Sequence, residues 1–160
     1  VIGVFKKYEC TINKTKSHVV LVNPSNMGNL GTIIRTLTGF GINDLVIISP
    51  GVDIFDPKVV RASMGAVFRI NYKYYDNFED YQVSYKNHKI FTFMLDGEKT
   101  LKEVDHNNDL FSLVFGNEAT GLDPSYLKIG TSVFIKHTNQ IDSLNLTIAA
   151  GIALYEFCSN

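Results

Sequence analysis

The chain has 160 residues, of which 45% are hydrophobic and 19% are charged, and these values are typical of a single globular domain. Its formal net charge of −1 excludes a surface that is strongly basic throughout, so any nucleic-acid contact must be a local patch. No apolar run reaches the ~18 residues of a membrane span and no signal peptide opens the chain, so we expect neither feature. We expect one domain over residues 1–160.

The N-terminal third predicts one strand–helix–strand unit. After a short strand at 1–5, residues 18–23 form a continuous apolar run, the pattern of a buried parallel strand. A turn-rich cluster follows at 24–29, and apolar residues then recur at helical spacing from 30 to 40. Residues 45–48 predict the second buried strand, which Pro50 and Gly51 close.

The alternation of helices and strands continues to the C-terminus. The sequence next predicts a helix at 56–63 opened by Asp56 and Pro57, a strand at 67–72, a helix at 76–86 opened by a capping box at Asp76, and a strand at 89–95. A short helix at 101–104 and a strand at 111–115 follow. The predicted elements end with one helical turn at 123–128, a strand at 131–135 and a helix at 143–158. Such alternation predicts an α/β fold with a mainly parallel sheet flanked by helices.

Three polar loops follow predicted strands, at residues 23–29, 116–121 and 136–142. In open α/β sheets, ligand sites form at the carboxyl ends of the strands. We therefore expect the three loops to meet at one edge of the sheet.

Several polar residues in these segments have both a structural and a functional explanation. The Gly28 turn could cradle an anion at a helix N-terminus or be an ordinary turn, and it lacks the full GxGxxG of dinucleotide sites. Arg35 could bind a phosphate in bidentate fashion or simply lie on the surface. Glu118 could accept hydrogen bonds from loop N–H groups, cap a turn or pair with Arg35. Ser143 could cap the last helix, although Asn145 adds a second polar group there.

The remaining chemistry-bearing residues favour structural roles. The cysteines Cys10 and Cys158 lack metal-ligand spacing and suit a reducing cytoplasm. Four scattered histidines, none paired at ligand spacing, argue against a metal site: His18, His88, His106 and His137. Five tyrosines favour packing over base stacking: Tyr72, Tyr74, Tyr75, Tyr81 and Tyr85. A phosphate-binding patch could draw on Lys6, Lys7, Lys14, Lys16, Arg61 and Arg69.

Three segments together resemble one protein family. Residues 29–36 (NLGTIIRT), 113–122 (LVFGNEATGL) and 143–156 (SLNLTIAAGIALYE) look like motifs 1, 2 and 3 of the SpoU (TrmH-like) RNA ribose 2′-O-methyltransferases of the SPOUT superfamily. Residues 60–66 (VRASMGA) also match a stretch of that family. The resemblance covers nearly the whole chain, and the three motifs in this order are highly specific.

The resemblance implies a C-terminal deep trefoil knot, a bent S-adenosylmethionine bound by the loops of motifs 2 and 3, and a homodimer whose interface completes the active site. The residues at the family's catalytic positions are Asn29, Arg35, Glu118, Ser143 and Asn145. Those at its cofactor positions are Phe115, Gly116, Asn117, Gly121, Ile135, Lys136, Ser143 and Leu144. The sequence departs from the family at Lys136 and His137, where a Pro-Met pair is usual.

The expected function is therefore transfer of a methyl group from S-adenosylmethionine to a ribose 2′-hydroxyl of tRNA or rRNA, in the cytoplasm and without a metal. Which RNA is modified stays open, as does an RNA-binding extension before Val1. One rival is a nucleotide-dependent oxidoreductase, for which the Gly28 loop lacks the fingerprint and Asp53 is a poor ribose ligand. Another is a non-catalytic RNA-binding module, which would not need all five motif side chains.

Overall fold

Seven strands form one parallel sheet in the computed structural model, which describes residues 4, 6–8, 10–105 and 109–159. The strands are β1 His18–Val22, β2 Asp44–Ile48, β3 Asn71–Tyr75, β4 Lys89–Phe93, β5 Lys99–Thr100, β6 Phe111–Phe115 and β7 Thr131–Phe134. Their order across the sheet is β3-β2-β1-β6-β4-β7-β5, and neighbouring strands are parallel. The expected α/β fold with a parallel sheet is confirmed.

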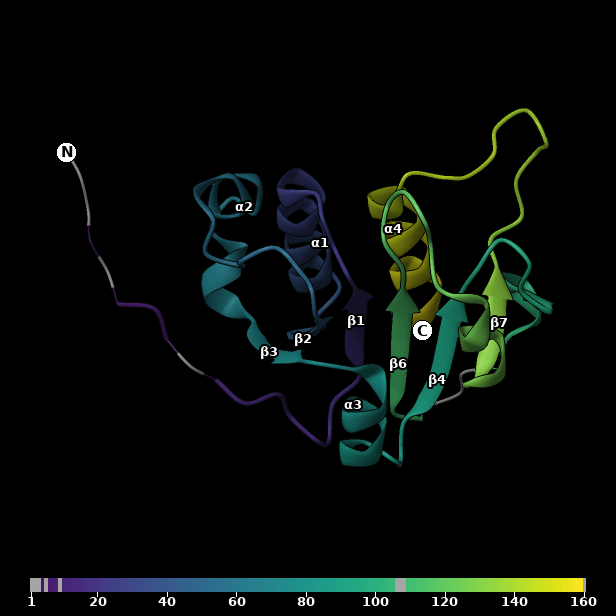
Figure 1. Cartoon of the computed structure of the whole chain (residues 1–160), viewed down its shortest axis with the longest axis horizontal. Coiled ribbons are helices and arrows are strands. Elements are labelled where there is room, and N and C mark those ends of the chain that lie inside the picture. The colour runs from purple at the N-terminus through teal and green to yellow at the C-terminus, as the bar shows by residue number, and fades with distance from the viewer. Residues whose placement is uncertain (1–3, 5, 9, 106–108, 160) are drawn as a thin grey trace.

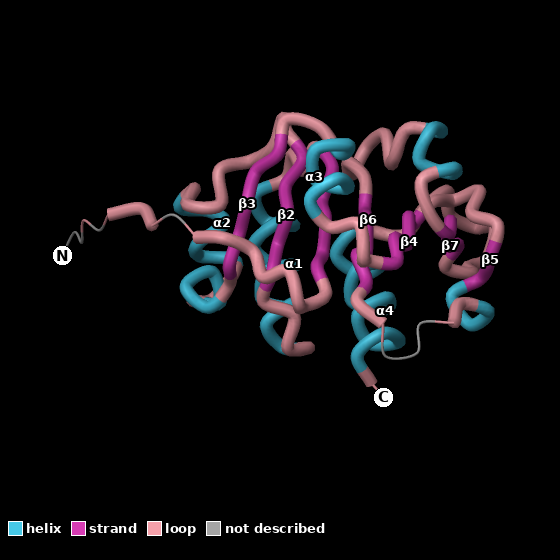
Figure 2. Tube along the Cα trace, turned by 90° about the horizontal axis from the view of Figure 1, so that it is seen from below, coloured by secondary structure: helices cyan, strands magenta, loops and turns pink. Residues whose placement is uncertain are grey.

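Helices cover both faces of this sheet (Figures 1 and 2). The α-helices are α1 Met27–Gly39, α2 Pro57–Ala62, α3 Phe78–Ser84 and α4 Leu146–Cys158, and three short 3-10 helices are η1 Ala66–Arg69, η2 Leu101–Glu103 and η3 Pro124–Lys128. Helix α1 lies between α2 and α4 in one layer, and α3 packs on the opposite face.

Alternating side chains of the central strands explain why these strands read as continuous apolar runs. In β1, Val19 and Leu21 join the core under α1, α2 and α4, whereas Val20 joins the core under α3. In β6, Leu113 joins the core under α1, α2 and α4, and Val114 joins the core under α3. Because both faces are covered, every position of β1 and β6 except Val22 is buried, and no polar alternation appears.

The strand expected at 67–72 is wrong. Residues 66–69 form η1, and β3 begins only at Asn71. Gly65, with a φ of 85°, reverses the chain after α2 and starts the 3-10 turn. Val67 is nevertheless fully buried. A short buried apolar segment therefore satisfied the strand pattern without being extended.

Two helix starts differ from the predictions because a neighbouring asparagine is the cap. Asn77, not Asp76, caps α3 by accepting a hydrogen bond from the Asp80 N–H. Asn145, not Ser143, caps α4 by accepting from the Thr147 N–H, so the last helix begins at Leu146. Helix α1 begins three residues earlier than expected. The caps at Asp56 and Asp123 are as predicted.

Helix α4 is buried on one side and exposed along a stripe on the other. Ala150, Ala153, Leu154 and Phe157 are buried against the sheet and α1. Ile148, Ile152 and Tyr155 are 54%, 38% and 63% exposed, and their spacing of four and three residues places them on one outward face. A single chain therefore leaves an apolar stripe uncovered.

The tyrosine cluster is packing, as expected. Tyr75, Tyr81 and Tyr85 are at most 8% exposed, and the rings of Tyr81 and Tyr85 stack with centroids 5.0 Å apart. The hydroxyl groups of Tyr72 and Tyr74 donate to the carbonyls of Tyr8 and Val52. These rings hold α3 and the N-terminal segment on the sheet.

A buried hydrogen-bond chain links β1 to α3 and β6. The ring of His18 is fully buried; Nε2 lies 2.8 Å from the Asn13 carbonyl and Nδ1 lies 3.0 Å from the Tyr81 hydroxyl. The Tyr81 hydroxyl lies 2.5 Å from Ser112 Oγ, which is 2.9 Å from His88 Nδ1. Because a carbonyl only accepts, Nε2 of His18 carries the proton, and a neutral His18 accepts from Tyr81.

The buried hydrogen bonds of His18 and His88 predict that the protein loses stability in mild acid. Burial lowers the pKa of His18 to about 4, and burial also lowers that of His88. In the unfolded chain His18 takes up a proton near pH 6.5, whereas in the folded chain it does so only near pH 4. The free energy of unfolding therefore falls as the pH drops through this window, by about 3 kcal/mol for His18. Urea unfolding between pH 7 and 4.5 measures the slope, and His18→Gln is expected to flatten it. An unchanged slope in His18→Gln would contradict the assignment.

Two absences hold for the part of the chain that the structure describes. No helix there is long and apolar enough to cross a membrane. No group of three or more His, Cys, Asp or Glu there is placed to hold a metal ion. The strand expected at 1–5 lies almost entirely outside the described residues, and so does His106.

Candidate active site

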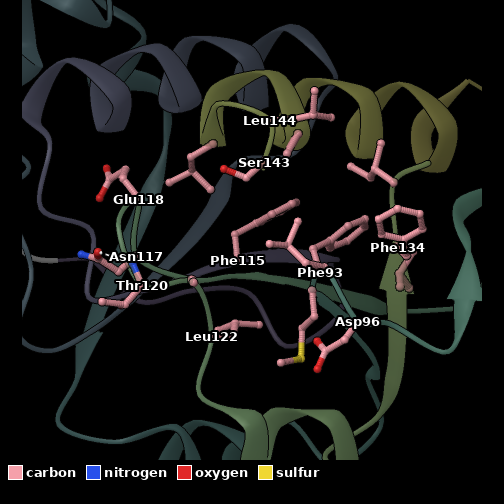
Figure 3. Close-up of a pocket in the computed structure, with 18 of the residues that line it drawn as sticks. Phe93, Asp96, Phe115, Asn117, Glu118, Thr120, Leu122, Phe134, Ser143 and Leu144 are labelled. Carbon is pink, nitrogen blue, oxygen red and sulfur yellow. Dashed lines mark hydrogen bonds between the residues drawn. The ribbon is translucent and has the colours of Figure 1, made fainter. Parts of the chain in front are cut away.

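A cavity of about 430 Å³ lies at the carboxyl edge of β4, β6 and β7 (Figure 3). The loop after β6, residues 116–122, forms one side, and residues 135–144 with the start of α4 form the other. Asn117 and Glu118 stand at one end, and Phe93, Phe115 and Phe134 line the middle and the far end. Two of the three polar loops therefore meet here, as expected from the topology.

The loop after β6 is closed on itself. Asn117 and Gly121 exchange two backbone hydrogen bonds, of 3.2 and 2.9 Å, and Gly121 has a φ of 69°. A Cβ atom on Gly116 would lie only 2.1 Å from the Gly121 carbonyl carbon. The Asn117 side chain accepts from the Ala119 N–H and donates to the Asn23 carbonyl. The glycines thus permit a tight loop that presents backbone groups to the cavity.

Glu118 joins this loop to the N-terminus of α1. Its carboxylate accepts hydrogen bonds from the backbone N–H groups of Ser25 and Asn26, at 3.1 and 3.2 Å, and from Ser25 Oγ at 2.9 Å. Asn29 Nδ2 donates a fourth bond, at 3.3 Å. Partial burial raises the pKa of Glu118, but these hydrogen bonds outweigh burial and hold the pKa below the ordinary value. Glu118 is therefore ionised and fixes Asn29 beside the cavity.

This geometry decides two alternatives that the sequence left open. The anion next to the start of α1 is Glu118 itself, which accepts hydrogen bonds from the N–H groups of Ser25 and Asn26. Gly31 has a packing role, because a Cβ there would lie 2.5 Å from the Val59 carbonyl oxygen on α2. Neither of the two ion pairs among the described residues includes Arg35 or Glu118.

Arg35 is exposed and does not line the cavity of its own chain. It is four residues after Gly31 and so shares the helix face that meets α2. Asn29 and Arg35 are six residues apart, which places their side chains roughly 120° apart around the helix. Glu118 therefore lines the cavity and holds Asn29 by a hydrogen bond, whereas neither Asn29 nor Arg35 lines the cavity.

The similarity to known proteins follows the same segments. The sequence matches the model of the SpoU rRNA methylase family over residues 16–155. The chain belongs to this SpoU family. The resemblance inferred from the three motifs is thereby confirmed.

Relatives of this SpoU chain include a 23S rRNA (adenosine(1067)-2′-O)-methyltransferase of Streptomyces azureus, 30% identical over 86% of this chain and 52% of the relative. A putative tRNA (cytidine(34)-2′-O)-methyltransferase of Bacillus subtilis is 28% identical over 91% of this chain and 93% of the relative. An AdoMet-bound rRNA methyltransferase from Sinorhizobium meliloti superposes with a TM-score of 0.81 and 30% identity, covering 94% of this chain and 57% of that one. The chain spans about half the length of several curated relatives.

The expected cofactor residues of the SpoU motifs lie at the cavity, with one exception. Seven of them line it: Phe115, Gly116, Asn117, Gly121, Ile135, Ser143 and Leu144. Lys136 is exposed and does not line the cavity. His137 lines it instead, with Nδ1 2.9 Å from the Ile135 carbonyl. Asn145 was expected to be catalytic, but its side-chain oxygen accepts the hydrogen bonds from Thr147 that cap α4.

The three sequence motifs do not include the residues after and within β4 that line one wall of the cavity. Phe93, Met94 and Asp96 line the cavity, and the rings of Phe93 and Phe115 stack with centroids 4.5 Å apart. The signal was present in the topology, because β4 is the neighbour of β6 and its carboxyl end also reaches this edge. Its place between β6 and β7 is not visible in the chain order.

Proposed function

We propose that this chain is the catalytic domain of an S-adenosylmethionine-dependent RNA methyltransferase that modifies a ribose 2′-hydroxyl of tRNA or rRNA in the cytoplasm. Family membership and the names of the relatives support this proposal. The observation that carries it is the cavity at the carboxyl edge, where the closed loop of motif 2 faces residues 135–144.

The cavity suits the proposed cofactor in size and lining. Its volume of about 430 Å³ lies within the ~300–1,000 Å³ typical of small-molecule sites. Phe93, Phe115 and Leu122 offer apolar contact for an adenine ring, and the loop of Gly116 and Gly121 presents backbone polar groups. When bound, S-adenosylmethionine supplies an activated methyl group on sulfur.

The side chains around the cavity have distinct proposed roles. Glu118 holds Asn29, and together with Ser143 they orient the target ribose. Asn145 acts through the cap that fixes the start of α4. A guanidinium is always protonated, so we assign Arg35 to fixing the target phosphate and polarising the hydroxyl, with the proton leaving to phosphate or water. Holding the reactants in line supplies several kcal/mol of the rate enhancement.

The proposed active unit is a homodimer in which each protomer donates Arg35 to the cavity of its partner. Arg35 is exposed and does not line the cavity of its own chain, which supports completion in trans. The exposed stripe of Ile148, Ile152 and Tyr155 on the neighbouring helix supports an apolar contact between copies. A C-terminal trefoil knot in one domain is part of the same proposal, supported by the two loops that line one cavity.

Gly116→Ala is expected to weaken S-adenosylmethionine binding at least about tenfold and to destabilise the protein by about 1–3 kcal/mol. The added Cβ meets the backbone of Gly121 and Leu122 at 2.1–2.4 Å, and backbone atoms cannot swing aside as a side chain could. Calorimetric titration and thermal unfolding measure the two effects. Gly39→Ala is the matched control, because a Cβ there meets nothing within 4 Å. Binding of wild-type strength in Gly116→Ala would contradict the site.

The proposed function is tested by methyl transfer from labelled S-adenosylmethionine to total RNA of a strain that lacks the gene. Mass analysis of the digested RNA is expected to show a 2′-O-methyl nucleoside. Methyl groups on a base, or none, would refute the assignment. A non-catalytic RNA-binding module, the main rival, predicts that calorimetry detects no S-adenosylmethionine binding.

A further inference from the structure

The turn that joins α2 to η1 exposes two large apolar side chains. Met64 is 73% exposed and Phe68 is 55% exposed. Met64 has a φ of 51°, a left-handed conformation that is strained for a residue with a long side chain. Its strain is not offset by burial of that side chain. Strain of this kind, retained at the surface, is typical of segments with a binding role.

The backbone of this turn is fixed, so the exposed side chains are held in place. The Met64 N–H donates to the Arg61 carbonyl, and the Ala66 N–H donates to the Ser63 carbonyl. Ser63 is fully buried, and its hydroxyl donates to the Val60 carbonyl at 2.8 Å. Val67, between the two exposed residues, is buried in the core.

The surroundings of the turn are basic, although the whole chain has a net charge of −1. Residues 57–72 contain no aspartate or glutamate and three basic residues, all exposed: Lys58, Arg61 and Arg69. Arg35 lies on the face of α1 that meets α2, because Gly31 on that face approaches Ala62 and Ser63. Two apolar side chains thus stand among positive charges beside the proposed phosphate ligand.

We propose that residues 61–69 are a platform for an unpaired nucleotide that neighbours the methylated one in the RNA substrate. Met64 and Phe68 contact the face of its base, and Arg61 and Arg69 contact the flanking phosphates. This inference rests on the proposed function, in which Arg35 binds the phosphate of the target nucleotide at the cavity of the partner chain. A base is free to contact such side chains only where it is unstacked, so the platform selects a loop or single strand over a duplex.

The charge of the surface favours RNA over a second copy of this chain as the occupant. The apolar stripe that suits a second copy lies on α4, and α1 separates α4 from α2. A contact between two copies of the turn would bring like charges together. Basic side chains around an aromatic ring are instead the pattern of single-strand recognition.

Met64→Gly and Phe68→Ala test the platform. Glycine relieves the strain at position 64, so the Tm is not expected to fall. Each variant is expected to raise the KM for RNA from a deletion strain about tenfold, the size of one lost base contact, with kcat and S-adenosylmethionine affinity unchanged. Phe68→Tyr is expected to retain the wild-type KM. Val83→Ala on α3, which removes an apolar side chain that is 65% exposed elsewhere, is the control.

A binding measurement separates this proposal from the proposed function. Fluorescence polarisation with a mixed-sequence single-stranded 20-mer RNA and with the same strand in a duplex is expected to show single-strand preference in the wild type and its loss in Met64→Gly. If the wild type methylates RNA but both variants keep its KM and its preference, the platform is wrong. If the variants dissociate the dimer, the turn is a contact between copies and the platform is also wrong. If the wild type transfers no methyl group yet shows this preference, the proposed function fails, and the turn is then a single-strand RNA contact without the methylated neighbour.

Discussion

Arg35→Ala is expected to lower kcat by about 10²–10³-fold, the typical effect of removing one group that stabilises developing charge. The S-adenosylmethionine affinity is expected to stay within twofold of the wild type, because Arg35 does not line the cavity of its own chain. The Tm is expected to be unchanged, since the side chain is exposed on α1. Steady-state kinetics and calorimetry measure the two quantities. Near-normal turnover would exclude Arg35 from the reaction.

Arg35→Lys is the matched control for this prediction. It keeps the positive charge but loses the planar fork that contacts a phosphate through two N–H groups. A partial recovery of kcat is expected, and full recovery would show that charge alone is sufficient.

Mixing two inactive variants tests whether Arg35 acts in the partner's cavity. In a heterodimer of Arg35→Ala with Glu118→Ala, one cavity receives an intact arginine and an intact loop. After statistical exchange, the mixture is expected to regain about a quarter of wild-type activity, because half of the dimers then carry one intact site of two. No recovery in a mixture shown to have exchanged would place Arg35 in its own chain's site.

Glu118→Gln is expected to reduce kcat by about 10²-fold and the free energy of unfolding by about 1–2 kcal/mol. All four bonds to the carboxylate come from donors, so the glutamine NH₂ group must face an N–H or O–H donor. Asn29 then loses its anchor beside the cavity. Kinetics and urea unfolding at pH 7 provide the measurement.

The loss of unfolding free energy in Glu118→Gln is expected to depend on pH, and the pKa of Glu118 gives the sign. The pKa of Glu118 is lowered in the folded chain, so its charge stabilises the fold above the unfolded value of about 4.3 and this contribution is lost as pH falls through the folded pKa. The difference in stability between the wild type and Glu118→Gln is therefore expected to narrow in acid. Glu118→Asp keeps the charge on a shorter side chain and is the control. A difference that does not change with pH would mean that shape, not charge, is what Glu118 contributes.

Much of the fold could be predicted because its signals are local. Strands β1 and β6 are short runs in which only His18 and Ser112 are polar, and Asp56 and Asp123 each cap a helix by accepting from the backbone N–H two residues on. The errors arose where two local signals compete. Ser143 and Asn145 are both good caps, and only the backbone selected Asn145. Val67 is buried in a 3-10 turn that satisfies the same apolar pattern as a strand.

Local patterns were enough to predict the family, the alternating architecture and the loops that meet at the site, because motifs and periodicity are carried by residues close together in the chain. The partners of the site residues, in contrast, depend on how the chain folds. Glu118 meets Ser25 across 93 positions, and β4 enters the cavity wall because the sheet order places it between β6 and β7. The same is true of Arg35, whose direction depends on which face of α1 packs against α2. Contacts between distant segments depend on packing, which no local pattern records.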